Sequence, residues 1–322
     1  MRLLANTNFN FIRWRWHAIA LSVAIIAIGA VTMVQRGGMS LGVDFTGGTV
    51  MVLQFPQRVG EDVVRNALRS IPGDPLVQQF GPVSQNQVMV RLPMMEGQVE
   101  GTALEQDANR VRAALTAANV GAFDVVTTDL VGPVIGKDLQ RRGIFATIAS
   151  LLGIMAYIAF RFRLSFGVGA IVASIHDILV TLSVLALFNY ELSLNVVAAI
   201  LTLTGYGVND QIVVFDRVRE NLRTMRRDAM DLVINRSVNE TLPRTVITAG
   251  VTFLAVLALY LFGGEVLKGF AFAMLVGIVT STYSTVYIAS AVAVLLSPRR
   301  DATVATASAA AKGSKKAARR TP

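Results

Sequence analysis

An aspartate inside an apolar stretch is the residue of this sequence best placed to do chemistry. Asp210 has mainly apolar neighbours at 195–203 and 212–215. On a helix it lies about 9 Å from Asp216, which we expect at the edge of that stretch. Because an aspartate at the centre of a membrane span costs about 2.5–3.5 kcal/mol, we expect the Asp210 carboxyl to face other helices or water.

A cation lies where it could act on this carboxyl. Arg244 directly precedes the apolar run 246–262. Desolvation favours the protonated form of a buried acid, whereas a nearby cation favours the ionised form. We predict that Asp210 gains and loses a proton as access alternates between the two membrane faces, and that Arg244 stabilises the deprotonated state. A static buried ion pair that fixes helix packing is the alternative.

Four further polar residues could assist proton transfer. Asn209 is expected to donate a hydrogen bond to the neighbouring carboxyl, and Tyr206 shares its helical sector. His176 and Asp177 lie inside another apolar stretch. A histidine that titrates near neutrality could shuttle protons, while a hydrogen bond that only fixes helix packing is the other interpretation.

Composition excludes several other kinds of chemistry. The chain has no cysteine, so it can form no disulfide, thiol nucleophile or thiolate-held metal centre. With only His17 and His176 available, a metal site with several histidines is also excluded. No GxxxxGK sequence is present, so we expect no ATP hydrolysis here and predict neither a metal nor a cofactor.

The elements that must position these residues are membrane-spanning helices. The 322 residues are 53% hydrophobic and only 16% charged, whereas soluble domains carry about 25% charged residues. Because a span needs about 20 mainly apolar residues, six segments qualify, the first being an uncleaved anchor without a clear signal-peptidase site. The predicted spans are 17–34, 143–160, 166–188, 194–216, 246–262 and 269–296.

Basic residues near the span ends predict the orientation. The segment 1–16 has three arginines and no acid, and the loop 217–245 has seven arginines against four acids. The segment 35–142 is balanced, with ten basic and eleven acidic residues. We therefore predict cytoplasmic termini, a cytoplasmic loop 217–245 and a periplasmic domain 35–142. The net charge of +9 then reflects topology and contact with anionic lipid, and nucleic acid is not an expected partner.

The two remaining parts follow from local patterns. Periodicity predicts a β-α-β-β-α-β order in 35–142, a ferredoxin-like α+β domain between the first and second spans of the helical bundle 143–296. We interpret it as a rigid docking module without catalytic residues. The tail 297–322 is basic and poor in large apolar residues, which predicts disorder. The domain's predicted elements are strands at 49–55, 76–80, 87–92 and 122–130, with helices at 60–71 and 103–119.

Four sequence blocks carry a family resemblance. They are LGVDFTGGT from Leu41, His176–Asp177, GYGVNDQIVVFDRVREN from Gly205 and NETLPRT from Asn239. Together they resemble the SecF family, the smaller membrane subunits of the SecD–SecF complexes of bacterial protein export, over about residues 9–297. The first block supplies the family's signature turn, which is Asp44, Phe45, Thr46, Gly47 and Gly48. The chain departs from the family's usual GYS-x-NDT by having Gly207 and Gln211.

The resemblance implies half of an RND-type proton-driven transporter in the bacterial inner membrane. It implies that Asp210 and Arg244 take part in proton transport. It also implies that SecD is the partner subunit. The SecYEG channel, YajC and a translocating unfolded preprotein are further expected partners, and the expected role is to use the proton-motive force late in translocation. Two alternatives stay open, a proton-driven exporter of small molecules or lipids and a scaffold that conducts nothing.

Overall fold

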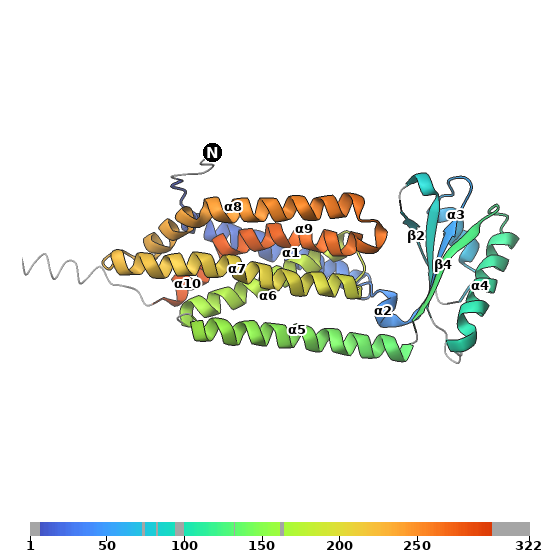
Figure 1. Cartoon of the computed structure of the whole chain (residues 1–322), viewed down its shortest axis with the longest axis horizontal. Coiled ribbons are helices and arrows are strands. Elements are labelled where there is room, and N and C mark those ends of the chain that lie inside the picture. The colour runs from blue at the N-terminus through green and yellow to red at the C-terminus, as the bar shows by residue number, and fades with distance from the viewer. Residues whose placement is uncertain are drawn as a thin grey trace, which may run out of the picture.

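The computed structural model describes residues 7–72, 75–81, 83–93, 100–131, 133–161 and 164–297. A bundle of long helices forms one part of the molecule, and a small α+β domain lies at one end of it (Figure 1). The described N-terminal segment begins toward the opposite end of the bundle. All of the predicted tail 297–322 except Ser297 lies outside the described residues.

Six helical segments are long and apolar enough to cross a membrane within the described ranges, which confirms a polytopic helical membrane protein. The sixth contains a five-residue π-helical segment, η3, between two α-helices. Such segments are rare and often occur at functional sites. The spans are α1 (Arg15–Gln35), α5 (Pro133–Arg161), α6 (Leu164–Leu187), α7 (Leu194–Thr224), α8 (Met230–Phe262) and the run α9 (Glu265–Ser284), η3 (Thr285–Ala289) and α10 (Ser290–Leu296).

The segment 217–245, expected as a loop, is mostly helical. It forms the end of α7 and the start of α8, which are joined by the short link 225–229. Ion pairs between neighbouring turns, such as Arg217 with Glu220 at 2.6 Å and Arg236 with Glu240 at 2.9 Å, stabilise these polar helix ends. The low hydropathy of this segment marks the ends of the two apolar runs. It does not mark the ends of α7 and α8, because both helices continue past those runs.

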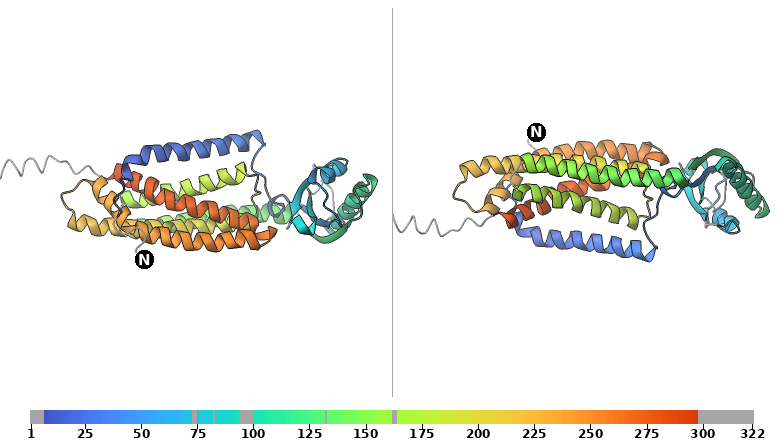
Figure 2. Two further views of the ribbon diagram at one scale, coloured as in Figure 1. Left: turned by 90° about the horizontal axis from the view of Figure 1, so that it is seen from above. Right: turned by 90° about the horizontal axis from the view of Figure 1, so that it is seen from below.

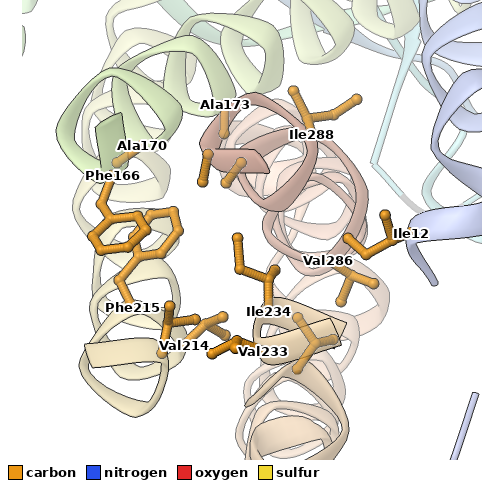
Figure 3. Close-up of a cluster of buried hydrophobic side chains, with 14 of the residues drawn as sticks. Ile12, Phe166, Ala170, Ala173, Val214, Phe215, Val233, Ile234, Val286 and Ile288 are labelled. Atoms are coloured by element: carbon orange, nitrogen blue, oxygen red, sulfur yellow. The ribbon is translucent and has the colours of Figure 1, made fainter. Parts of the chain in front are cut away.

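Apolar side chains fill the bundle between α6, α7, α8 and η3. Figure 3 shows Phe166 of α6 stacked on Phe215 of α7, with ring centroids 5.2 Å apart, beside Val233 and Ile234 of α8. The helix α1 lies at one edge of the bundle (Figure 2) and exposes an apolar outer face. An exposed apolar face of this kind is suited to contact lipid or a helix of a partner protein.

The small domain is a four-stranded antiparallel sheet with two helices. Its strands follow the order β2-β3-β1-β4, and its elements follow the predicted β-α-β-β-α-β order. One face buries Met51, Leu53 and Val90 against the helices, and the opposite face is directed toward the bundle. The elements are β1 (Gly48–Gln54), α3 (Glu61–Leu68), β2 (Leu76–Phe80), β3 (Gln87–Leu92), α4 (Glu100–Ala117) and β4 (Asp124–Val131).

The chain between α1 and β1 is fastened to the link between α6 and α7. Leu192 accepts a hydrogen bond from the Gly42 N–H and donates one to the Ser40 carbonyl, both at 2.8 Å. The short helix α2 (Val43–Thr46) follows, and the Asp44 carboxylate accepts from the Leu194 N–H at 2.9 Å. A carboxylate is favoured at this position because the N-terminus of a helix carries a partial positive charge.

The N-terminal strap, residues 7–11, is held against the polar end of α8. Asn239 donates to the Phe9 carbonyl at 2.8 Å and accepts from the Phe9 N–H at 2.8 Å. Asn235, one turn earlier, donates to the same carbonyl at 3.0 Å and accepts from the Phe11 N–H at 2.9 Å. Two asparagine side chains thus satisfy the strap's backbone groups in place of a neighbouring strand.

Candidate functional site

Asp210 lies within the bundle, where α7 faces α8 and the π-helical segment. The Thr245 hydroxyl of α8 donates a hydrogen bond to its Oδ1 over 2.7 Å. Thr285, the first residue of the π-helix, lies close enough to the carboxyl to act on it. Oδ2 has no hydrogen-bond partner among the described residues. The expected polar environment inside the bundle is therefore present, and hydroxyl groups provide most of it.

Arg244 does not form the expected direct contact with Asp210. No ion pair joins them in the part of the chain that the structure describes, although the Arg244 charge acts on the carboxyl from nearby. The Arg244 side chain is exposed and lines a polar groove of about 650 Å³. Because successive residues of a helix point about 100° apart, Thr245 faces Asp210 when Arg244 faces this groove.

The same groove contains the charged ends of α7 and α8. Asp216 forms ion pairs with Arg161 at 3.2 Å and with Arg219 at 3.0 Å. Glu240 pairs with Arg217 at 2.6 Å. A polar groove thus lies at the end of the bundle that carries the α7–α8 link and is lined by α7 from Ile212 onward, two residues beyond Asp210.

Asn209 and Tyr206 were the two residues of α7 predicted to assist proton transfer at Asp210. Asn209 is exposed, and no hydrogen bond joins it to Asp210 within the described ranges, so the structure does not bring these two side chains together. Adjacent helical positions point about 100° apart, which accounts for their separation. Tyr206, one turn before Asp210, is half-buried and lies near both that carboxyl and Thr252 of α8.

His176 and Asp177 form a second buried polar site on α6. Nδ1 of His176 lies 3.0 Å from Oδ1 of Asp177, and Ser284 of α9 donates to Oδ2 of Asp177 over 2.8 Å. Both residues are 9% exposed. The Tyr283 ring stacks beside His176 with centroids 6.3 Å apart. The structure thus brings this pair toward α9 and not into direct contact with Asp210.

Sequence reasoning missed Gln211 and Thr285 as members of the site. Gln211 is 1% exposed, and neither amide atom has a hydrogen-bond partner among the described residues. Thr285 is equally buried at 1%. An amide next to Asp210 was visible as a departure from the family pattern, whereas nothing in the sequence marks Thr285, because it lies 75 positions away on another helix.

The signature turn joins the domain to the bundle beside the start of α7. Phe45 is buried, and Gly47 and Gly48 both have positive φ, at 72° and 135°. A Cβ at Gly48 would lie 2.3 Å from the Leu92 carbonyl oxygen. Glycine is therefore required there by both backbone conformation and space.

A charged contact strengthens this junction from the sheet. Arg91 of β3 forms an ion pair with Glu191, which lies in the α6–α7 link. Burial lowers the pKa of the Arg91 guanidinium, and the Asp44 carboxylate opposes this shift. Since the pKa of arginine ordinarily lies far above neutrality, Arg91 stays charged and attracts both carboxylates. Among the described residues, no cluster of three or more His, Asp or Glu side chains could hold a metal ion.

The fold and this site define a polytopic membrane protein with one α+β domain after its first span and an acidic residue inside its bundle. Comparison with known proteins identifies the class further. The family model for protein export membrane protein SecD/SecF, C-terminal, matches residues 111–299, and the model for the SecD/SecF GG motif matches residues 37–55. The chain belongs to the SecD/SecF family of protein export membrane proteins, in its SecF branch.

Individual relatives extend over nearly the whole chain. Protein translocase subunit SecF of Desulfurispirillum indicum is 41% identical over 90% of this chain and 92% of its own length. The SecF subunit of Escherichia coli O157:H7 is 39% identical over 91% and 89%. The crystal structure of SecDF from Thermus thermophilus, a translocon-associated membrane protein, matches with a TM-score of 0.79 at 35% identity. That match covers 92% of this chain and 39% of the longer SecDF chain.

Proposed function

We propose that this protein works with a SecD-type subunit and uses the proton-motive force to promote late stages of preprotein translocation through a SecYEG channel. The observation that carries the proposal is the part-buried Asp210, which lies between Thr245 and Thr285 with Arg244 nearby. An ionisable residue inside a bundle of spans is by default a candidate for proton or ion transport. Its relatives are named protein translocase subunits.

Asp210 would exchange a proton alternately with the two membrane faces. Each proton that crosses the membrane potential releases about 2.3 kcal/mol per 100 mV. The deprotonated carboxylate would attract Arg244 and accept from Thr245, whereas the protonated form would release that attraction. A few such cycles supply enough free energy to rearrange a helix bundle as a rigid body.

The α7 helix would carry this rearrangement to the periplasmic domain. Asp210 lies within α7, and the first residue of the same helix donates its N–H to Asp44 in the signature turn. The ion pair between Arg91 and Glu191 adds a direct contact from the sheet. The strand order and the helices on one face support a ferredoxin-like assignment for this domain, which would move relative to the membrane and act on the emerging polypeptide.

The proposed setting is the bacterial inner membrane. Segments 1–16, 217–245 and 297–322 would be cytoplasmic, 35–142 periplasmic, and 17–34 together with 143–296 would form the membrane part. SecD would supply a second, pseudo-symmetric set of spans, and its contact would cover part of the exposed apolar surface of the bundle. YajC and anionic lipid are further proposed partners. The 39% coverage of SecDF is consistent with a chain that works beside a second subunit.

Proton flux into vesicles tests this proposal. The full chain reconstituted with its SecD-type partner should conduct protons under an imposed membrane potential, and Asp210→Asn should reduce the flux at least about tenfold, since it removes ionisation but keeps shape. Asp138→Asn, on the exposed part of α5 where it pairs with Arg142, is the control. Equal flux through the Asp210→Asn variant would contradict the proton role.

The same preparations separate the alternatives. If depletion of the protein traps preproteins, and Asp210→Asn does not restore export, proton use is coupled to translocation. Flux without any effect on preproteins would indicate an exporter of small molecules or lipids. Export that is fully restored by Asp210→Asn would instead indicate a scaffold that conducts nothing.

A further inference from the structure

A second carboxyl, Asp177, lies beside α7 about one helical turn from Asp210. A Cβ built on Gly207 would be 3.5 Å from Oδ2 of Asp177 and 2.6 Å from Oγ of Ser281. Gly207 precedes Asp210 by three residues, which is about 4.5 Å along the helix axis. The absence of a side chain at Gly207 therefore leaves Asp177 of α6 facing the backbone of α7 close to Asp210.

Buried polar atoms without hydrogen-bond partners surround this stretch of α7. Unpartnered buried polar atoms are uncommon in folded proteins, and each one indicates an unseen water or a functional role. Here they come from α6, α7, α9 and η3. Among the described residues they include His176 Nε2, Asp210 Oδ2, both amide atoms of Gln211, Ser281 Oγ and Thr285 Oγ1.

A small cavity lies beside Gly207 and Ser281, between α6, α7 and α9. Its volume of about 10 Å³ is close to the minimum that one water molecule needs. Asp177 and Ser281 line it beside Gly207, together with mostly apolar atoms. A water there would have the Asp177 carboxylate and the Ser281 hydroxyl as partners, the minimum of two that holds a buried water in place, and it would occupy the position that a longer side chain at Gly207 would fill.

Hydroxyl groups continue from the cavity toward Asp210. Ser284 donates to Asp177 Oδ2 over 2.8 Å, and the next residue, Thr285, lies beside Asp210. These two residues mark the change from α9 to the π-helix η3. The wider π turn alters which side chains face α7 at this point, so consecutive hydroxyls reach two different carboxyls.

We propose that His176 and Asp177 form a second proton station, which exchanges protons with Asp210 through one water in the Gly207 cavity and the hydroxyls of Ser281 and Thr285. This inference rests on the proposed proton role of Asp210 and extends it to a second site on α6. Asp177 lies nearer than Asp210 to the domain end of the bundle, because Gly207 precedes Asp210 on a helix that starts at that end.

The transfer conserves protons and charge. The protonated Asp177 carboxyl gives its proton to the bound water, and the water passes one of its own to the Ser281 hydroxyl. Ser281 and then Thr285 each accept a proton and release their own hydroxyl proton, and the last proton reaches Asp210. Asp177 becomes an anion, and Asp210 becomes neutral. His176 Nδ1, 3.0 Å from Asp177 Oδ1, donates to that anion, and the Ser284 hydroxyl donates to the other oxygen. The next proton restores Asp177 once Asp210 has discharged toward the polar groove.

Substitutions at two positions test the route in vesicles that contain the full chain and its SecD-type partner. Asp177→Asn keeps shape and the contact from Ser284, and we expect it to lower proton flux at least about tenfold. Gly207→Ala and Gly207→Ser add the same Cβ against Ser281, but only serine restores a hydroxyl. We expect at least about fivefold higher flux in Gly207→Ser than in Gly207→Ala, with Asp138→Asn as the control.

Infrared difference spectra detect protonation of a carboxyl group directly. They would not change if Asp177 served only in helix packing. Acidification should produce the carbonyl band of a newly protonated carboxyl, and Asp177→Asn should remove part of it. An unchanged difference spectrum in Asp177→Asn would overturn the proposal, as would equal flux in the two Gly207 variants. If Asp210→Asn abolishes flux while Asp177→Asn conducts normally, the second station is wrong and the proton role of Asp210 stands. If Asp210→Asn conducts normally, both fail.

Discussion

Glu191 in the α6–α7 link forms an ion pair with Arg91 on strand β3. Glu191 lies two residues before Ser193, the N-cap residue of α7. The N-terminus of α7 is also held by Asp44, through the Leu194 N–H at 2.9 Å. Both carboxylates therefore connect the small domain to the one helix that carries Asp210. This geometry gives the domain a direct mechanical contact with the acidic site, through a rigid element rather than a flexible linker.

Neutralising either member of the pair should weaken the docking of the domain. Arg91→Gln and Glu191→Gln should each lower the free energy of unfolding by about 1–3 kcal/mol, because each leaves a largely buried charge without its partner. The double variant should recover part of the loss, and thermal unfolding in detergent measures this coupling.

The matched control for this cycle is Arg65→Gln. Arg65 pairs with Asp62 at the surface of α3, where both side chains are exposed. Surface pairs of this kind contribute about 0–1 kcal/mol. Strictly additive effects of Arg91→Gln and Glu191→Gln would show that the contact does not hold the domain.

Alanine substitutions at Gly38 and Gly48 should distinguish backbone strain from steric clash, because the two glycines have similar backbone conformations but different surroundings. Gly38 and Gly48 have φ of 133° and 135°, but a Cβ would meet nothing within 4 Å at Gly38, whereas at Gly48 it would lie 2.3 Å from the Leu92 carbonyl oxygen. Gly38→Ala should cost about 1–2 kcal/mol through strain alone. Gly48→Ala should cost about 1–3 kcal/mol more because β1 must move from β3.

Melting temperatures of the two alanine variants in the same detergent check this difference. A similar loss in both would mean that conformation alone selects glycine in the signature turn. A larger loss in Gly48→Ala would show that the close approach of two strands, in addition to backbone conformation, requires glycine at position 48.

The Thr245 hydroxyl should matter for proton flux more than a neighbouring threonine on the same helix. Thr245→Val removes the 2.7 Å hydrogen bond to Asp210 Oδ1. A hydrogen bond to a charged group contributes about 1.5–3 kcal/mol, which corresponds to about 10–100-fold in rate if it acts in the limiting step. Thr248→Val is the control, because the Thr248 hydroxyl bonds only to backbone carbonyls of α8.

Flux measured at several imposed potentials distinguishes these variants from wild type. A Thr248→Val protein as impaired as Thr245→Val would trace the effect to helix packing. Normal flux in Thr245→Val would mean that the observed hydrogen bond takes no part in proton exchange.

Loss of one asparagine should release the N-terminal strap. Asn239→Ala removes both hydrogen bonds to Phe9, and deuterium exchange of the Phe9 amide should become faster by at least about tenfold. Asn66→Ala, on α3 of the small domain, is the control. Unchanged exchange at Phe9 would indicate that the membrane or a partner, rather than α8, protects this segment.

Hydropathy and periodicity predicted the large features of the fold. Six apolar runs became six helices, and the strands predicted at 76–80 and 87–92 agree with β2 and β3. These features depend on local patterns of burial, which a sequence displays directly. The helical ends of α7 and α8 were missed because they are amphipathic: their charged faces form ion pairs between neighbouring turns, while Val218, Val233 and Ile234 on the other faces are buried in the core.

Contacts within the site were harder to predict. Arg244 was expected against Asp210, but the adjacent Thr245 makes that contact, and Asn209 points away from its neighbour. A shift of one residue rotates a side chain by about 100°, and the rotation of each helix depends on packing among all of them. The ion pair between Arg91 and Glu191 joins positions 100 residues apart and has no local signal.

The N-terminal strap has a consequence for biogenesis. Its two anchoring asparagines lie on the fifth span, so the first span can be fastened at this end only after the ribosome has made most of the chain. Until then, the first helix must stay in the bilayer with its N-terminal end unsecured. Fastening of the strap to α8 is thus one of the last steps of assembly, and a truncated product that stops before Asn235 would leave that step undone.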